Sequence, residues 1–411
     1  MRPCVAFVCA AFLVFSGAGV LVAEDWPQWR GENRDGVSVE TGFLHSWPEG
    51  GPPLTWKITG IGSGFSTVAV AKGRIYTMGA VGGKEFVFAL DESTGNQIWE
   101  APNGGLYRNN RGDGPRGTPT IDGSRLYVLG GRGDFSCRET ESGRVVWAVN
   151  LLEEFNAKNT KWGISESPLI VGDKVLVNAG GRDASVVAFD KNDGTVLWKS
   201  QSDEAGYSSA VYTELGGVPQ AIFLTGERAL GLDIRNGKLL WSYDRVSNRT
   251  ANVATPVLRE PYVFVSSAYS TGGALLELQP ANGEIGMREV YFQNNMRNHH
   301  MSSILVGDIL YGFSDAILTA MRFADGEIVW KDRSVGKGSL VYADGHFVAL
   351  SEKGVVGLIE ATPDGYREKG RFQLPDRSGE NTWAHPVIAN GHLYIRDQGV
   401  LRKYDIRKTG S

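Results

Sequence analysis

Ten side chains able to hold an anionic or planar ligand occur in the polar segments between the apolar runs of this chain. Arginine binds carboxylates through two parallel hydrogen bonds, and tryptophan stacks on planar rings. The candidate ligand-binding residues are Arg108, Arg111, Arg116, Trp162, Arg249, Asn252, Arg297, His299, His300 and Trp383. They predict a cationic pocket with aromatic walls for a small anionic or planar ligand. The alternative is that these side chains bond backbone groups at loop ends and line a solvated channel.

The adjacent pair His299-His300 needs an interpretation of its own. Neighbouring residues of a strand point to opposite faces, so one metal ion is not expected to bind both rings. One ring could serve as a general base, and the alternative is a solvated or hydrogen-bonded loop pair. No catalytic residue and no metal ligand is assigned, because the chain has no Gly-x-Ser-x-Gly elbow, zinc-spaced histidine set or phosphate loop.

A repeated unit supplies the elements that must position these residues. It consists of an aliphatic run, a polar turn that ends in Gly, and an aliphatic pair before Trp, and it occurs at 88–99, 137–147, 188–198, 231–241 and 321–330. A repeat of roughly 45 residues is typical of a propeller or a solenoid. The tryptophans are predicted to pack between neighbouring blades. Unit five has Met287 in the Trp position, and unit seven, at 360–365, lacks the aromatic residue.

Each unit divides into four strand-like pieces separated by polar-Gly turns, which favour hairpins. A Ser/Thr/Pro and small-aliphatic signature marks the first, innermost piece, and it begins at Ser66, Thr118, Ser167, Ser208, Thr255, Ser302, Gly338 and His385. Eight such starts predict an all-β fold, an eight-bladed β-propeller of four-stranded antiparallel blades. Loops between successive blades meet at one face, so the ten candidate residues are expected around the mouth of the central channel.

The eighth unit predicts how the ring closes. It ends after its third strand, at 400–405, and has no fourth strand. The segment at 53–57 resembles an orphan fourth strand with Trp56 in the repeat position. We expect this N-terminal strand to close the last blade beside the C-terminus, because closure protects both sheet edges.

Residues 1–23 have the pattern of a signal peptide, with Arg2 before a mostly apolar run and small or apolar residues before Glu24. A signal anchor is the alternative, although 16–19 interrupt the apolar run. The predicted organisation is a signal peptide at 1–23, an N-terminal extension at 24–52 and a single propeller domain at 53–411. Removal of the signal leaves no membrane span and predicts a periplasmic or secreted location.

Composition narrows the expected partners. The net charge of −4 over 411 residues is mild and argues against a nucleic-acid partner. Cys137 is the single cysteine left after signal removal, so no internal disulfide is expected. Its expected role is that of a small buried residue, and a reactive thiol is the alternative. We expect a monomer whose partners are a small anionic or planar ligand or proteins of the cell envelope.

The repeats resemble those of the quinoprotein-type (PQQ-like) β-propeller family, whose unit is Ala-x-Asp-x-x-x-Gly-x-x-x-Trp. The resemblance covers 54–405 and is carried by units such as 89–99 and 232–241. It implies the propeller fold, but not one activity. The family includes both pyrroloquinoline-quinone (PQQ) dehydrogenases and non-catalytic scaffolds such as the outer-membrane protein assembly factor BamB. The opening segment at 25–36 resembles the start of PQQ-binding-like propeller proteins.

The resemblance leaves the cofactor unknown. The dehydrogenases carry a vicinal Cys-Cys pair over the quinone and hold calcium with Glu, Asn and Asp, whereas here Cys137 stands alone and no position-matched calcium set is found. PQQ is therefore possible but has no matched site. The sequence favours an exported ligand- or protein-binding scaffold in the cell envelope. The alternatives are a PQQ-dependent oxidoreductase acting on an alcohol or sugar at the channel mouth, and carbohydrate binding through Trp26, Trp29 and Trp47.

Overall fold

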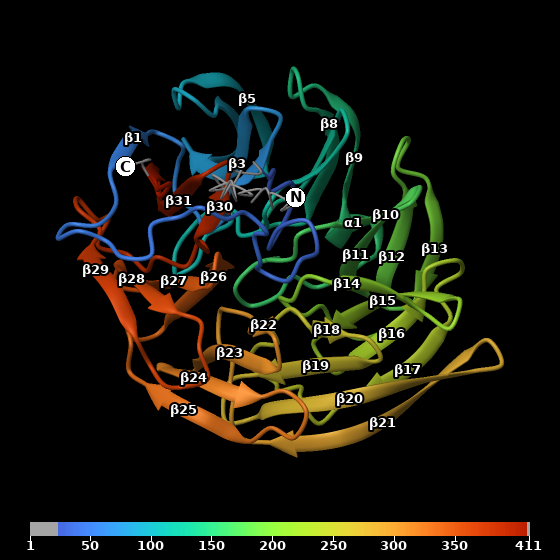
Figure 1. Ribbon diagram of the computed structural model, residues 1–411. Helices are drawn as coiled ribbons and strands as arrows, with labels where there is room; N and C mark the ends of the chain where they lie inside the picture. The colour runs from blue at the N-terminus through green and yellow to red at the C-terminus, as the bar shows by residue number, and fades with distance from the viewer. Residues whose placement is uncertain (1–23, 409–411) are drawn as a thin grey trace, which may run out of the picture.

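The computed structural model describes residues 24–408, and the predicted signal peptide at 1–23 lies outside them. Eight four-stranded antiparallel sheets surround one axis as the blades of a propeller (Figure 1), which confirms the predicted fold class. The one helix in the described range is a single turn, α1 (Leu151–Glu154). The Asn150 side chain caps this turn by accepting hydrogen bonds from the backbone N–H groups of Leu152 and Glu153.

Each blade runs outward from its inner strand in chain order. Blades one to four comprise β2 (Ala69–Ala71), β3 (Arg74–Val81), β4 (Lys84–Asp91), β5 (Gln97–Gly105); β6 (Thr120–Asp122), β7 (Arg125–Leu129), β8 (Asp134–Glu139), β9 (Val145–Asn150); β10 (Leu169–Val171), β11 (Lys174–Gly181), β12 (Ala184–Asp190), β13 (Val196–Ser200); and β14 (Val211–Leu215), β15 (Val218–Leu224), β16 (Ala229–Asp233), β17 (Leu239–Tyr243).

Blades five to seven follow the same order, and blade eight draws its outer strand from the start of the chain. They comprise β18 (Val257–Arg259), β19 (Tyr262–Ser267), β20 (Gly272–Ala281), β21 (Glu284–Gln293); β22 (Ile304–Val306), β23 (Ile309–Ser314), β24 (Ile317–Arg322), β25 (Ile328–Asp332); β26 (Gly338–Ala343), β27 (His346–Ser351), β28 (Val355–Glu360), β29 (Glu368–Gln373); and β30 (Val387–Ala389), β31 (His392–Asp397), β32 (Val400–Asp405), β1 (Leu54–Thr59).

The Ser/Thr signature at the inner strands joins neighbouring blades around the axis. Ser167 Oγ accepts a hydrogen bond from the Thr118 backbone N–H at 2.9 Å, and Ser209 Oγ accepts one from the Ser167 N–H at 2.9 Å. Ser302 Oγ accepts from the Thr255 N–H at 2.8 Å. An inner edge strand would otherwise leave these buried donors without partners, so the hydroxyl groups satisfy them and tie blade two to blade three, blade three to blade four, and blade five to blade six.

The repeated tryptophans pack between blades, as predicted. The Trp147 indole N–H donates to the Lys191 carbonyl of the next blade at 3.1 Å. The turn glycine of that blade, Gly194, faces the ring, and a Cβ there would lie 2.7 Å from it. Trp241 differs, since it donates to Gln220 of its own blade. The same contact with the next blade is made by Trp56, Trp99, Trp198 and Trp330.

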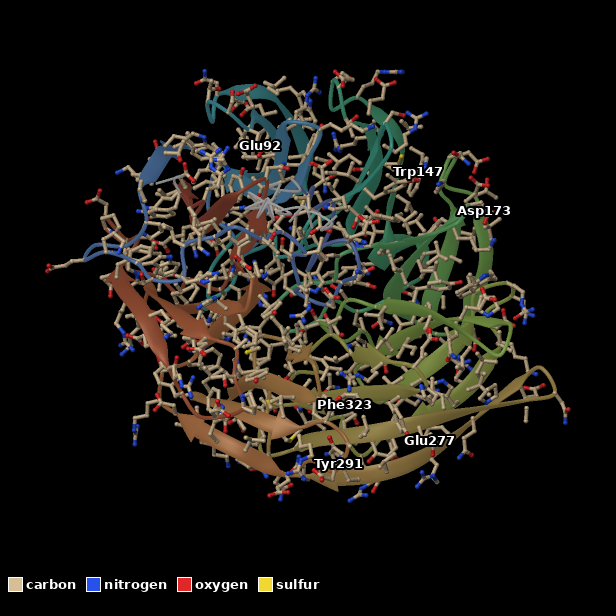
Figure 2. All side chains as sticks on the ribbon, in the orientation of Figure 1. Glu92, Trp147, Asp173, Glu277, Tyr291 and Phe323 are labelled. Carbon is tan, nitrogen blue, oxygen red and sulfur yellow. The ribbon has the colours of Figure 1, made fainter. Side chains whose placement is uncertain are left out.

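In blade five, the prediction that Met287 occupies the tryptophan position is wrong. Tyr291 lies opposite Leu275 just before the strand bulge, which is the register of the tryptophans in the other blades. Its hydroxyl group donates to the Phe323 carbonyl of blade six at 3.0 Å (Figure 2). The β20–β21 hairpin is longer than the other outer hairpins, so the aromatic residue lies further from the turn than the repeat spacing indicates.

Blade seven lacks the aromatic residue, as predicted, and receives one from the N-terminal segment. Gly370 lies opposite Leu358 in the tryptophan register. A Cβ at Gly370 would lie 2.6 Å from Cβ of Trp47, whose ring packs on Phe372 with the centroids 5.6 Å apart. Trp47 and Trp26 are 8% and 2% exposed. The hypothesis of exposed carbohydrate-binding aromatics is therefore wrong for these two residues.

Strand β1 closes the ring beside the C-terminal strand β32, as predicted. Trp56 pairs with Lys403 across the two strands, and Figure 1 shows the blue β1 beside the red strands of blade eight. Glu92 joins blade one to blade eight, because its carboxylate accepts a hydrogen bond from the hydroxyl group of Tyr394 in blade eight at 2.8 Å. Its carbonyl accepts from Lys403 Nζ at 2.9 Å. Buried Arg396 adds donor contacts from blade eight to Ser66, Thr77, Met78 and Gly62.

Residues 24–52, the N-terminal arm, cross the centre of the ring (Figure 1). Arg34 donates to the carbonyl groups of Ala210, Ser167 and Pro168 at 2.7–2.8 Å, at the inner strands of blades three and four. Arg30 donates to Ser302 and Ser303 at the inner strand of blade six, at 3.2 and 2.8 Å.

Both arginines are buried, with 4% and 3% exposure for Arg30 and Arg34, and both have positive φ values, 63° and 57°. A positive φ is unfavourable for a residue with a Cβ. The hydrogen bonds from each guanidinium group to carbonyl groups of the inner edge strands offset this unfavourable backbone conformation. Through these bonds the arm closes the central channel from within.

Seven clusters of buried apolar residues lie in and between the blades, and Cys137 belongs to one of them as a buried free thiol. Its position confirms the expected structural role. Burial raises the pKa of this thiol, which keeps it protonated at neutral pH. Among residues 24–408, no helix has the length and apolar character needed to cross a membrane.

Candidate functional site

A cavity of about 550 Å³ lies at the mouth of the central channel. Its lining residues come from all eight blades and from the N-terminal arm. They are Trp29, Phe65, Arg111, Arg116, Lys161, Trp162, Ser165, Tyr207, Ser209, Thr250, Ala251, Val253, Tyr269, His299, His300, Ser302, Lys337, Glu352, Asn381, Trp383 and His385. The volume falls in the usual range of small-molecule pockets.

Strand order explains why these residues meet. In a four-stranded antiparallel blade, the loop to the next blade and the hairpin between the second and third strands lie at the same end. Each of the eight loops between blades contributes to the lining, from Phe65 after β1 to Trp383 after β29. Tyr269 and Glu352 come from the hairpins β19–β20 and β27–β28.

The N-terminal arm forms the floor of the cavity. The Trp29 indole N–H donates to the Thr255 hydroxyl group at 2.9 Å, and its ring lies against His385 with the centroids 4.6 Å apart. Arg30 of the arm donates to the carbonyl group of Ser302, one of the lining residues. The cavity is therefore a blind pocket rather than part of an open channel.

Six of the ten predicted ligand-binding residues line this cavity: Arg111, Arg116, Trp162, His299, His300 and Trp383. The other four lie outside it. Arg108 lies 3.7 Å from Asp113, and Arg297 pairs with Asp315 at 2.8 Å. Arg249 is exposed beside the mouth.

Asn252 is 1% exposed and has a purely local role. Its amide group donates to the Thr225 and Gly226 carbonyls at 3.0 and 2.9 Å, and its oxygen accepts from the Asn248 N–H at 2.9 Å. For Asn252 the alternative interpretation, bonding of backbone groups at loop ends, describes the contacts.

The Arg116 side chain also donates its hydrogen bonds to backbone carbonyl groups. Its Nε donates to the Trp162 carbonyl at 2.8 Å, and its two terminal nitrogens donate to the Gly114 and Gly112 carbonyls. The guanidinium group lies over the Tyr107 ring, 4.6 Å from the centroid, and burial lowers its pKa. Arg116 therefore shapes the wall and contributes positive potential, while few of its donors remain for a ligand.

Arg111 and Lys161 are the cations most available to a ligand. Both are exposed at the mouth, and neither side chain has a hydrogen-bonding or ionic partner among residues 24–408. The lining holds four cationic side chains, with Arg116 and Lys337 added, against one carboxylate, Glu352. The formal charge of the pocket is thus positive, which suits an anionic ligand.

Two pairs of packed aromatic rings form part of the cavity walls. Trp162 packs on Tyr207 with the centroids 5.8 Å apart, and Trp383 packs on Phe65 at 5.0 Å. The Trp162 backbone N–H donates to the Tyr207 hydroxyl oxygen at 3.3 Å, which fixes the first wall. These rings offer planar apolar surface inside a cationic rim.

The two adjacent histidines lie in the bend between β21 and β22, not in a strand, so the rule of opposite faces does not apply to them. Their ring centroids are 5.7 Å apart. One ligand atom from each, together with one from Glu352, lie within 4.8 Å of one another. The expectation that the rings diverge is therefore wrong. Burial and nearby Lys337 lower the pKa of His299 to about 4, and burial lowers the pKa of His300 well below its ordinary value, so both are neutral at pH 7.

Sequence reasoning missed Trp29, Tyr269, Lys337 and Glu352 as lining residues. It considered only the loops between blades as the source of the mouth. The hairpins between second and third strands share that face, and this rule alone would have added Tyr269 and Glu352. Nothing in the sequence indicates that Trp29 reaches the axis.

The residues of the cavity do not suit the calcium that accompanies the quinone in the dehydrogenases. Ca²⁺ takes six to eight oxygen ligands. The one candidate metal-binding group in the described residues offers a single carboxylate, Glu352, and two imidazoles. The free thiol of Cys137 is buried in a blade core and does not line the cavity. These residues do not fit calcium-assisted quinone oxidation.

Eight blades joined by interblade aromatics, with a pocket at the mouth, define a quinoprotein-type propeller. The chain belongs to the family described as outer membrane protein assembly factor BamB, whose model matches residues 83–332. It is similar to the outer membrane protein assembly factor BamB of Shewanella oneidensis, with 25% identity over 372 residues that cover 84% of this chain and 86% of the relative.

Solved structures share the fold. The structure of BamB from Moraxella catarrhalis matches with a TM-score of 0.62 and 16% identity, covering 86% of this chain and 99% of that one. A quinohemoprotein alcohol dehydrogenase from Pseudomonas putida HK5 matches with a TM-score of 0.63 and 12% identity, covering 94% and 81% of the two chains. At these identities the likeness concerns the fold alone.

Proposed function

We propose that this protein is an exported binding scaffold of the cell envelope whose mouth pocket takes a small planar anion. The observation that carries the proposal is the blind cavity of about 550 Å³, with Arg111 and Lys161 exposed at its rim and Trp162 and Trp383 in its walls. Charge attracts the ligand, and stacking on the indole rings selects a planar one.

The envelope location rests on other grounds. The signal-like segment at 1–23 supports export, and the family name refers to outer-membrane protein assembly. Envelope proteins are the partner class that follows from this kinship. Expression of a tagged chain in a Gram-negative host tests the location: we expect release with the periplasmic fraction, and retention in the cytoplasm would overturn it.

Quinone-dependent oxidation of an alcohol or sugar is the second candidate. The shared fold with a quinohemoprotein alcohol dehydrogenase supports it. The single carboxylate and the paired imidazoles of the mouth argue against it, because they do not suit calcium. Binding without turnover is therefore the function that the geometry supports best.

Calorimetric titration of the chain that starts at Glu24 tests the pocket. The probes are PQQ and mellitate, both planar polycarboxylates, and citrate, a tricarboxylate that is not planar. We expect PQQ and mellitate to compete for one site and citrate to bind much more weakly. The Trp162→Leu variant should lose the preference for planar anions, because it keeps the charges and removes a stacking surface.

Two results would overturn the proposal. Failure of both planar anions to bind would remove the ligand pocket. Dye reduction with an alcohol or sugar in the presence of PQQ and Ca²⁺ would replace the scaffold with an oxidoreductase. The matched control is Arg249→Met, an exposed arginine beside the cavity, which should leave the PQQ affinity unchanged.

A further inference from the structure

Three metal-ligating side chains converge on one edge of the mouth pocket: His299, His300 and Glu352. His300 Nδ1 lies 3.6 Å from Glu352 Oε1. Two ligands of a tetrahedral Zn²⁺ ion, each about 2.0–2.1 Å from the metal, are about 3.3 Å apart. The His300–Glu352 pair therefore stands near the separation that one ion requires. The third ligand atom is within 4.8 Å of both.

Unpartnered buried nitrogens are an independent observation at the same place. Both ring nitrogens of His300 and Nδ1 of His299 are buried, and within residues 24–408 none of the three has a hydrogen-bonding partner. The His300 side chain is only 10% exposed. A buried polar atom without a partner costs about 1–3 kcal/mol. Coordination of a metal ion removes this cost, because each free nitrogen gains a bond.

Surrounding groups hold the three side chains in place. The Tyr269 hydroxyl group contacts His299 Nε2 at 2.9 Å, which leaves Nδ1 to face a metal ion. The Trp383 indole N–H donates to Glu352 Oε1 at 2.8 Å. Such outer contacts orient metal-binding imidazoles and carboxylates.

From this geometry we propose that His299, His300 and Glu352 bind one divalent first-row transition-metal ion, with Zn²⁺ as the best fit. Two imidazoles and one carboxylate are borderline ligands that suit Zn²⁺ and not Ca²⁺ or Mg²⁺. Three protein ligands leave a fourth position open toward the cavity, where all three residues are part of the lining. The site lies in the pocket proposed for the planar anion, but other side chains build it, so Zn²⁺ binding can be tested without that ligand.

Lys337 competes for the same carboxylate. Its Nζ lies 3.3 Å from Glu352 Oε1. A metal ion at this position must displace the ammonium group, because two cations would otherwise share one carboxylate oxygen. Loss of the lysine charge should therefore strengthen metal binding, an effect that a purely structural role of the three ligands does not predict.

The test uses the chain that starts at Glu24, dialysed against a chelator. Calorimetry with ZnCl₂ measures stoichiometry and affinity, and the absorbance of bound Co²⁺ reports its ligands. We expect one Zn²⁺ per chain and a Co²⁺ spectrum typical of four or five ligands. Glu352→Gln and His300→Ala should each weaken Zn²⁺ binding by more than about a hundredfold, because loss of the outer partners that orient a ligand already costs about tenfold to a hundredfold.

Two further variants sharpen the test. Lys337→Met should tighten Zn²⁺ binding by about tenfold, which corresponds to about 1.4 kcal/mol. His45→Ala is the matched control, because His45 lies near Asp344 on another part of the molecule. This variant should leave the Zn²⁺ affinity unchanged. Because Glu352→Gln keeps the side-chain shape, it remains informative where His300→Ala fails to fold. Absence of stoichiometric Zn²⁺ binding, or equal affinity in the wild type and Glu352→Gln, would overturn the proposal.

Discussion

The two ends of the central channel use the same residue type in opposite ways. At the arm, Arg30 and Arg34 are buried and donate to backbone carbonyl groups of the inner strands. At the mouth, Arg111 is exposed and its side chain has no partner among the described residues. Arg116 is intermediate, since it lines the cavity but donates to three carbonyl groups.

Available partners, rather than residue type, decide what each arginine does. Inner edge strands expose carbonyl groups toward the axis, and a buried guanidinium group that meets them acts as an internal tie. Exposed loops offer few fixed acceptors, so the guanidinium group remains available to a ligand. Stability is therefore expected to depend on the arm, and ligand affinity on the mouth.

Removal of the arm and of β1 should have the largest effect. Deletion of 24–60 takes away both the arginine contacts to the inner strands and the fourth strand of blade eight. We expect the ring to unfold rather than lose a tail, as followed by circular dichroism and thermal melting. The reference is the chain that starts at Glu24. A truncated protein with the same melting temperature would refute the closure of the ring by this segment.

Arg34→Met should have the next largest effect, a loss of about 3 kcal/mol or more in the free energy of unfolding, because each buried acceptor left without a partner costs about 1–3 kcal/mol. The change leaves the carbonyl groups of Ala210, Ser167 and Pro168 without their shared donor. Arg111→Met is the matched variant at the mouth and should change stability by less than about 0.5 kcal/mol. Chemical denaturation of both measures the comparison directly. Equal losses in the free energy of unfolding for the two variants would contradict the distinction between the arm and the mouth.

The third effect depends on pH. Glu166 is fully buried near Arg34, and burial raises its pKa to about 8. Because its folded pKa exceeds the unfolded value of 4.5, the folded state holds its proton more tightly. The contribution of Glu166 to stability is therefore largest below pH 4.5 and is lost as the pH rises from about 4.5 to about 8.

Glu166→Gln removes this dependence and keeps the acceptor for the Asn178 N–H. The variant should be more stable than the wild type above pH 8, by on the order of 2–4 kcal/mol, and the difference should shrink toward pH 5. Unfolding curves at pH 5, 7 and 9 measure it. A difference that does not change with pH would show that Glu166 is ionised in the folded protein throughout.

The smallest effect concerns the mouth alone. Arg111→Met should lower the affinity for PQQ or mellitate by about tenfold, or about 1.4 kcal/mol, because one charged hydrogen-bond donor is lost. Calorimetry gives the affinity, and an unchanged melting temperature serves as the internal control. Full affinity in this variant would assign the ligand contacts to Lys161 or to none of the rim cations.

The repeat was sufficient to predict the scaffold because each blade is specified locally. Polar-Gly turns, small inner residues and the tryptophan after the last turn occur within one unit, and Trp56 marked the strand that closes the ring. The prediction failed at Met287, where a longer hairpin moved the aromatic position to Tyr291. Spacing alone does not reveal such an insertion, whereas the strand register does.

The pocket was predicted only in part. Loop composition identified six lining residues, including Arg111, Trp162 and Trp383. It also selected Asn252 and Arg297, whose partners are neighbours in the fold. The sequence does not show whether a polar side chain in a loop contacts a carbonyl group, contacts a carboxylate or is exposed to solvent. Only its surroundings separate these cases.

By itself, the sequence determined the number of blades, their order and the strand that closes them, because those features repeat and rest on local turn and packing preferences. The tertiary structure alone decided which charged groups meet. It placed Arg34 against three inner carbonyl groups, and it brought Glu352 to His299 and His300 across about fifty residues of chain. These contacts depend on loops that do not repeat, and the loops reach their relative positions only when the ring is closed.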